Sequence, residues 1–179
     1  MSAARQKKMS SHLPVLELLF KYSDIKTVFE YGCGNHSTNF FVSHAQSVVS
    51  VEMNRIAWVE KLKKEIKSDK LNLLFIKGLE AIEYFKSTNK SYDLVFVDGD
   101  GQLRRNCASN AFGRAETIVV HDINLTWKRW RHKGWLSMEV PGEYKIITMN
   151  LAYPATTVYT KNQKLFDELK KENSILIRG

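Results

Sequence analysis

Hydrophobic residues along this chain fall into short runs that alternate with segments of mixed polarity. The runs are rich in β-branched and aromatic residues and are bounded by polar or glycine positions, which is typical of buried strands. Because parallel strands need connections of about a dozen residues, this alternation favours a parallel sheet covered by helices. The predicted strands are residues 26–30, 47–51, 71–77, 92–98 and 116–120.

The segments between these strands carry helical signals. Asn54 can cap a helix that extends to about Ser68, in which Val59, Leu62 and Ile66 form an apolar stripe. The other predicted helices begin at about residue 37 or span residues 79–85, 101–113 and about 163–171.

The turn after the first predicted strand contains a glycine pair, in the segment Glu30-Tyr-Gly-Cys-Gly-Asn-His-Ser-Thr38. Glycines let a ligand approach the backbone closely, and the following helix start offers free N–H groups to negative charge. Glu52 ends the next apolar run, at the spacing where an acid accepts hydrogen bonds from ribose hydroxyls. The pattern predicts a nucleotide-cofactor pocket. A dinucleotide fingerprint would place glycine or alanine at Ser37, so a nicotinamide or flavin is less favoured.

Three motifs together resemble class I S-adenosylmethionine-dependent methyltransferases. The loop from Glu30 to Gly34 matches their acid-x-Gly-x-Gly motif, and Glu52 fits the acid that ends their second strand. Residues 92–99 look like their fourth strand with its terminal Asp98. The loop and the Val-Asp-Gly ending are most similar to small O-methyltransferase-like members.

The resemblance implies an α/β fold, a Rossmann-like three-layer sandwich with a mostly parallel seven-stranded sheet and an antiparallel C-terminal strand. Residues 144–151 and 156–161 fit the closing antiparallel pair of such a sheet. We expect a single domain over residues 1–179, in which residues 1–11 form a flexible basic segment.

The implied cofactor is S-adenosylmethionine, bound around the glycine loop and the strand ends. His36 stands where these enzymes often have a third glycine, which is a departure from their pattern. Glu80 lies where such folds contact adenine, although an acid in the first turn of a helix is equally typical of a solvated position. The expected cofactor-binding residues are Glu30, Gly32, Gly34, Ser37, Thr38, Glu52, Glu80 and Asp98.

Methyl transfer to a hydroxyl needs alignment of donor and acceptor and removal of a proton. In open α/β sheets ligands bind beyond the carboxyl ends of the strands, where Asp98, His121 and Asp122 are predicted to converge. His121 is the preferred general base because imidazole titrates near neutral pH. The alternative is a histidine with a purely structural hydrogen bond.

Some O-methyltransferases of similar layout use a divalent cation, and Asp98 and Asp122 match two of its ligands. Their third ligand is an Asn directly after the second Asp. Here Ile123 follows Asp122 and Asn124 comes one position late, so the oxygen ligand set usual for magnesium is incomplete. Magnesium therefore remains an option and not a requirement.

Aromatic and basic residues concentrate in residues 127–135, just after the fifth strand. Cations there can pair with phosphate or carboxylate, and indoles can cover a base or a sugar face. Asp100, Trp127, Arg129 and Trp130 are the expected substrate-binding residues, for a small-molecule or glycan-like acceptor that can be anionic. The alternative is that the tryptophans anchor a helix to the core.

Composition narrows the setting of the protein. Its 179 residues, 44% of them hydrophobic, can build one sizeable core, and the net charge of +8 favours anionic partners. Two distant cysteines give no disulfide framework, and the apolar run at residues 13–20 is too short to cross a bilayer. We expect a cytoplasmic protein without membrane insertion; its oligomeric state is open.

Two other functions remain alternatives. A nucleic-acid methyltransferase fits the charge, but the fourth strand ends in Asp-Gly-Asp-Gly and lacks the Asp/Asn-Pro-Pro-aromatic sequence associated with amino-group methylation. RNA binding would also be expected to show a longer basic track. The second alternative is a non-catalytic module that retains only the cofactor pocket.

Overall fold

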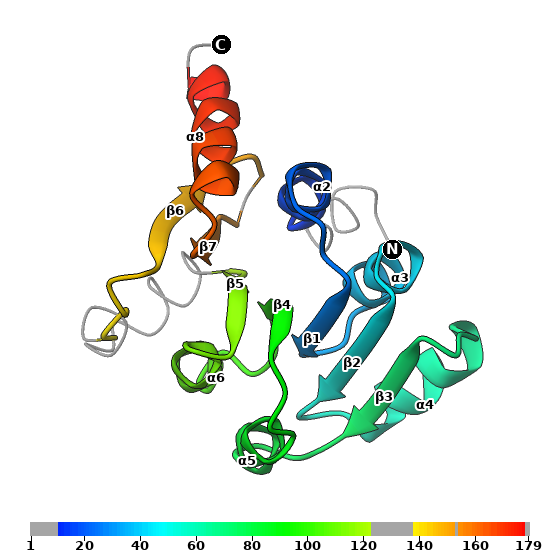
Figure 1. Cartoon of the computed structure of the whole chain (residues 1–179). Coiled ribbons are helices and arrows are strands. Elements are labelled where there is room, and N and C mark those ends of the chain that lie inside the picture. Colours follow the sequence, from blue (N-terminus) through cyan, green and yellow to red (C-terminus); the bar gives the residue numbers. More distant parts are fainter. Residues whose placement is uncertain (1–10, 123–137, 153, 178–179) are drawn as a thin grey trace.

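The computed structural model describes residues 11–122, 138–152 and 154–177, which form a seven-stranded sheet between two layers of helices (Figure 1). The strand order is β3-β2-β1-β4-β5-β7-β6. The strands are β1 (Thr27–Tyr31), β2 (Ser47–Glu52), β3 (Leu71–Phe75), β4 (Tyr92–Val97), β5 (Ala115–Val120), β6 (Lys145–Met149) and β7 (Thr156–Thr160).

Strand directions confirm the predicted fold class. Strands β1 to β5 pair in parallel, whereas β7 runs antiparallel to both β5 and β6. The order reverses between β1 and β4, which makes that point the topological switch of the sheet, where ligands bind in open α/β folds.

The helices divide between the two faces of the sheet. Residues of α2, α3 and α8 pack on one face together with α4, and residues of α5 and α6 pack on the other (Figure 1). None of these helices is long and apolar enough to cross a membrane. Their bounds are α2 (Leu13–Tyr22), α3 (Asn35–His44), α4 (Ile56–Glu65), α5 (Glu80–Ser87), α6 (Arg104–Ala111) and α8 (Gln163–Ile177).

Alternation along β1 explains how one strand serves both layers. Phe29 and Tyr31 point into the cluster with α5 and α6, while Val28 points into the cluster with α2, α3 and α8. All three side chains are fully buried, and burial of each contributes on the order of 2 kcal/mol. The apolar run predicted as the first strand is therefore β1, and helices cover both of its faces.

Several predicted bounds were wrong by a few residues. Helix α3 begins at Asn35 and not at Ser37, because Gly34 is already the extended N-cap. The helix after β2 ends at Glu65 and not at Ser68. The last helix continues beyond residue 171, to Ile177.

The turn after β1 depends on a close backbone contact. Gly32 has φ +88°, and a Cβ placed on it would lie 2.3 Å from Cα of Gly99. Gly32 N–H also donates to Val51 O at 2.7 Å. The loops after β1 and β4 can therefore touch only because Gly32 carries no side chain.

We expect Gly32→Ala to lower the free energy of unfolding by more than about 3 kcal/mol, since both the dihedral and the backbone of Gly99 exclude a Cβ. Gly113 is the matched control: its φ is +78°, but a Cβ there meets nothing within 4 Å. Gly113→Ala should cost only about 1 kcal/mol. Urea denaturation measures both, and equal losses would contradict the close contact.

Candidate active site

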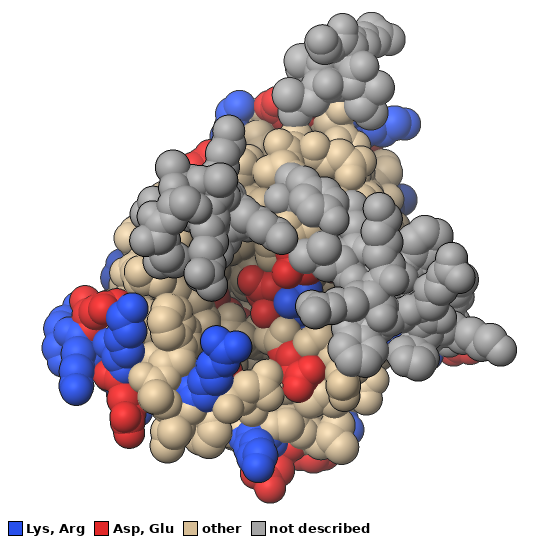
Figure 2. Space-filling model, turned by 180° about the vertical axis from the view of Figure 1, so that it is seen from behind, with Lys and Arg blue, Asp and Glu red and all other residues tan. Residues whose placement is uncertain are grey.

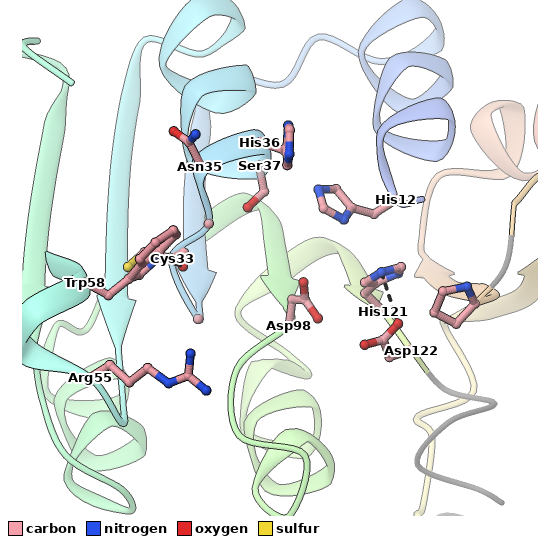
Figure 3. A pocket seen from close by; sticks show the side chains of 13 residues that line it. His12, Cys33, Asn35, His36, Ser37, Arg55, Trp58, Asp98, His121 and Asp122 are labelled. Carbon is pink, nitrogen blue, oxygen red and sulfur yellow. Dashed lines mark hydrogen bonds and ion pairs between the residues drawn. The ribbon is translucent and has the colours of Figure 1, made fainter. Parts of the chain in front are cut away.

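A pocket of about 560 Å³ lies at the carboxyl ends of the central strands, a volume in the range of small-ligand sites. On the face shown in Figure 2, acidic and basic side chains meet in a hollow. The pocket is lined by His12, Gly32, Cys33, Gly34, Asn35, His36, Ser37, Arg55, Trp58, Asp98, His121, Asp122 and Pro154 (Figure 3).

The structure brings six of the predicted site residues to this pocket: Gly32, Gly34, Ser37, Asp98, His121 and Asp122. The other predicted residues lie elsewhere. Glu30, Thr38 and Glu52 are buried behind the loop and strand ends. The predicted substrate residues Trp127, Arg129 and Trp130 lie outside the described residues.

Glu30 supports the glycine loop from beneath. Its Oε2 accepts hydrogen bonds from Thr38 Oγ1 at 2.7 Å and from Ser50 Oγ. Thr38 Oγ1 in turn accepts from Gly34 N–H at 3.0 Å. Burial raises the pKa of the Glu30 carboxyl to about 7. Its role in the described structure is to hold the loop, because its side chain is fully enclosed.

Glu52 fixes the turn after β2. Its Oε1 accepts from the backbone N–H groups of Asn54 at 2.9 Å and Arg55 at 3.1 Å. Trp58, on α4, donates from its indole N–H to Cys33 O at 2.9 Å. This bond ties the glycine loop to α4, so that Trp58 and Arg55 border the pocket opposite Asp98 (Figure 3).

Arg104, in the first turn of α6, joins the ends of β4 and β5. Its guanidinium donates to His121 O at 2.7 Å, Gly99 O at 3.1 Å and Asp98 Oδ1 at 3.0 Å. Its NH1 also lies 3.6 Å from Asp122 Oδ2. One fixed cation therefore lies beside both carboxylates predicted to bind magnesium. The magnesium prediction stays untested.

His121 is enclosed at the end of β5. Its Nδ1 lies 2.9 Å from Thr156 Oγ1, and its Nε2 lies 3.2 Å from both Ser11 Oγ and Asp122 Oδ1. Asp122 has φ +58°, an uncommon value for a residue with a side chain. Ser11, at the end of the predicted flexible segment, is thus buried against β5.

Burial shifts the pKa values of the pocket groups in opposite directions. It raises the pKa of Asp98 to about 7, with Arg104 opposing the shift. It lowers the pKa of His121 to about 3, with Arg104 adding to the shift, and lowers that of His12 to about 3. Both imidazoles are therefore neutral at physiological pH, and His121 is a weaker base than a typical histidine.

Two predicted residues lie outside the pocket lining. Glu80 is exposed at the first position of α5. Asp100 Oδ1 accepts from Gln102 N–H at 2.9 Å and shapes the turn that leads into α6. Neither lines the pocket.

Sequence patterns did not indicate His12, Arg55, Trp58 or Arg104 as site residues. His12 is the residue directly before α2. The one local signal for this position is Pro14, because proline is common in the first turn of a helix and so marks where α2 begins. Arg104 lies in a predicted helix, but no local pattern distinguishes a buried arginine from a solvated one.

We expect Glu30→Gln to flatten the pH dependence of stability. The unfolded carboxyl ionises near pH 4.5 and the folded one near 7, so ionisation costs the wild type about 3 kcal/mol of folding free energy between these values. The stability of the variant relative to wild type should rise by that amount from pH 4 to 8. The buried histidines also make stability depend on pH, but they do so equally in both proteins, so their effect cancels when the variant is compared with wild type. Exposed Glu60→Gln is the control; parallel curves for Glu30→Gln would contradict the shift.

We expect Arg104→Lys to lower the free energy of unfolding by roughly 2–4 kcal/mol, because lysine keeps the charge but cannot span several acceptors with a planar fork. Arg114→Lys is the matched control, since Arg114 donates to the α5 carbonyls of Phe85 and Lys86 at 3.0 and 2.9 Å and does not line the pocket. It should cost about 1 kcal/mol or less. Equal losses in denaturant titrations would refute the joining role of Arg104.

Known proteins match this chain in structure but not in sequence. No protein-family model and no curated protein sequence matches it. An O-methyltransferase of Bacillus cereus in complex with SAH, S-adenosylhomocysteine, superposes with a TM-score of 0.62 at 13% identity, covering 90% of this chain and 82% of that one.

Two further solved structures are similar. The SAH-bound methyltransferase PaMTH1 of Podospora anserina has a TM-score of 0.63 at 16% identity, covering 87% of this chain and 81% of its own. The O-methyltransferase TomG of Streptomyces achromogenes, solved with SAM, has a TM-score of 0.58 at 15% identity, covering 89% and 80%. This protein has the Rossmann-like fold of the class I S-adenosylmethionine-dependent methyltransferases.

Proposed function

We propose that this protein is an S-adenosylmethionine-dependent O-methyltransferase that acts on a hydroxyl of a small or glycan-like acceptor. The observation that carries the proposal is the position of the pocket. It opens at the switch point between β1 and β4, beside the glycine loop, in a fold shared with proteins solved with SAM or SAH.

In this proposal Gly32, Gly34 and Ser37 border the cofactor, which can approach the backbone of the loop closely. Glu52 Oε1 is held by two backbone N–H groups, and among the described residues Oε2 accepts only a long bond from Cys33 Sγ at 3.7 Å. We assign Oε2 to the ribose hydroxyls, which replace this thiol contact when the cofactor binds. Glu30 and Thr38 act indirectly by holding the loop. We assign the exposed Glu80, at the start of α5, to contact the adenine of the cofactor.

For the transfer step we assign the proton of the acceptor hydroxyl to Asp98. A carboxylate whose pKa is raised to about 7 is matched to proton removal at neutral pH. His121, with a pKa near 3, is better suited to orienting the acceptor than to accepting its proton. Asp122 holds the His121 ring at 3.2 Å.

An anionic acceptor is supported by charge. The net charge of the chain is +8, and the exposed Arg55 borders the pocket. A guanidinium can bind phosphate or carboxylate in a bidentate manner. Both cysteines are free and buried, which agrees with a reducing, cytoplasmic setting.

The first test is calorimetric titration with SAH, with NAD as the comparison ligand. We expect saturable SAH binding and no comparable NAD binding. Glu52→Gln should weaken SAH binding about 10-fold, equivalent to about 1.4 kcal/mol, because it loses a charged acceptor for the ribose but retains an oxygen for the turn.

Glu65→Gln is the matched control, an exposed acid at the end of α4. It should bind SAH as the wild type does. Absence of SAH binding, or a preference for NAD, would refute the cofactor assignment. Once binding is established, transfer of labelled methyl groups to a panel of phenolic, sugar and sugar-acid hydroxyls tests the acceptor class.

A further inference from the structure

His12 has an unusual environment for a histidine. Its side chain is 3% exposed, and neither ring nitrogen has a hydrogen-bond partner among the described residues. Its ring instead contacts the rings of Phe96 and His121, with centroids 5.3 and 4.9 Å away. A buried polar group without a hydrogen-bond partner lowers folding stability by about 1–3 kcal/mol. Such a group therefore needs an explanation, and a bound ligand is one.

The unpartnered ring points at two other potential ligands. One ligand atom from each of His12, Asp98 and His121 lies within 4.8 Å of the others. Figure 3 shows the three side chains directed toward one another across the pocket. They come from three separate parts of the chain, namely the residue before α2 and the ends of β4 and β5.

Neighbouring groups orient two of these side chains. Thr156 Oγ1 holds Nδ1 of His121 at 2.9 Å. Nε2 of His121 lies 3.2 Å from Ser11 Oγ and from Asp122 Oδ1, and it exchanges these contacts for the ion when a metal binds. Arg104 holds Asp98 Oδ1 at 3.0 Å, which leaves the second carboxylate oxygen available. Such outer hydrogen bonds are the usual support of metal-ligating imidazoles and carboxylates.

We propose that His12, Asp98 and His121 form a binding site for a divalent transition metal ion of the zinc type. Two imidazoles and one carboxylate suit zinc, cobalt, nickel or iron(II), whereas magnesium prefers oxygen ligands alone. Ligands about 2.1 Å from one ion lie about 3 Å apart. The three side chains therefore draw together when the ion binds.

This site differs from the magnesium site predicted from Asp98 and Asp122. It includes a histidine from outside the sheet, and it gives a partner to one of the two His12 nitrogens that otherwise have none among the described residues. Metal binding stands independently of methyl transfer, while its catalytic use rests on the proposed function. Three protein ligands leave one position of a tetrahedral ion open to the pocket, where the ion lowers the pKa of a bound hydroxyl; with metal bound, this effect replaces proton removal by Asp98.

The test is titration of tag-free protein with Zn²⁺ in the absence of S-adenosylmethionine, followed by calorimetry, with Mg²⁺ as the comparison. We expect saturable binding of one Zn²⁺ per chain and none of Mg²⁺. His12→Phe keeps the ring contacts but removes the ligand, and should weaken Zn²⁺ binding by more than the roughly 10-fold that loss of a supporting hydrogen bond costs. Exposed His44→Phe is the control and should bind as the wild type does.

A second measurement, the imidazole nitrogen resonances of the wild-type protein, needs no variant and so does not depend on whether His12→Phe folds. In wild-type protein, Zn²⁺ should shift the imidazole nitrogen resonances of His12 and His121, and should leave that of His44 unchanged. Absence of Zn²⁺ binding, binding that survives His12→Phe, or shifts confined to other histidines would overturn the site. Because no step uses the methyl donor, failure here is distinguishable from failure to bind SAH.

Discussion

The contact between Gly32 and Gly99 is the constraint on which the architecture of the pocket depends. It lets the backbone after β1 lie directly against the backbone after β4, closer than any side chain permits. Asp98 immediately precedes one of these glycines, so the same contact sets its carboxylate beside the glycine loop. The geometry of the switch point thus depends on the absence of a side chain at Gly32 as much as on the side chains that are present.

Charge at this rim is organised around one buried cation. Arg104 satisfies carbonyls of β4 and β5 and lies beside the carboxylates of Asp98 and Asp122. Burial meanwhile leaves the two histidines of the cluster neutral. The pocket therefore combines a fixed guanidinium, carboxylates and uncharged imidazoles.

Features that depend on a few neighbouring residues could be predicted from the sequence. Strand runs, the glycine pair and the acid after β2 each lie within a few residues, and the described structure confirms the strands and the parallel sheet. Features created by tertiary contacts were not. Glu30 was expected at the cofactor, but strand alternation turns it beneath α3, where Thr38 and Ser50 enclose it. His12 and Arg104 acquire their roles only through partners distant in sequence, which no periodicity encodes.

The bond between Ser11 and His121 joins positions 110 residues apart. Closing so long a loop is entropically costly, and contacts of this separation form late in folding. During synthesis, Ser11 precedes its partner and cannot contact it until His121, at the end of β5, has been made. The histidine cluster is therefore complete only when the residue before α2, the ends of β4 and β5 and the start of β7 have come together.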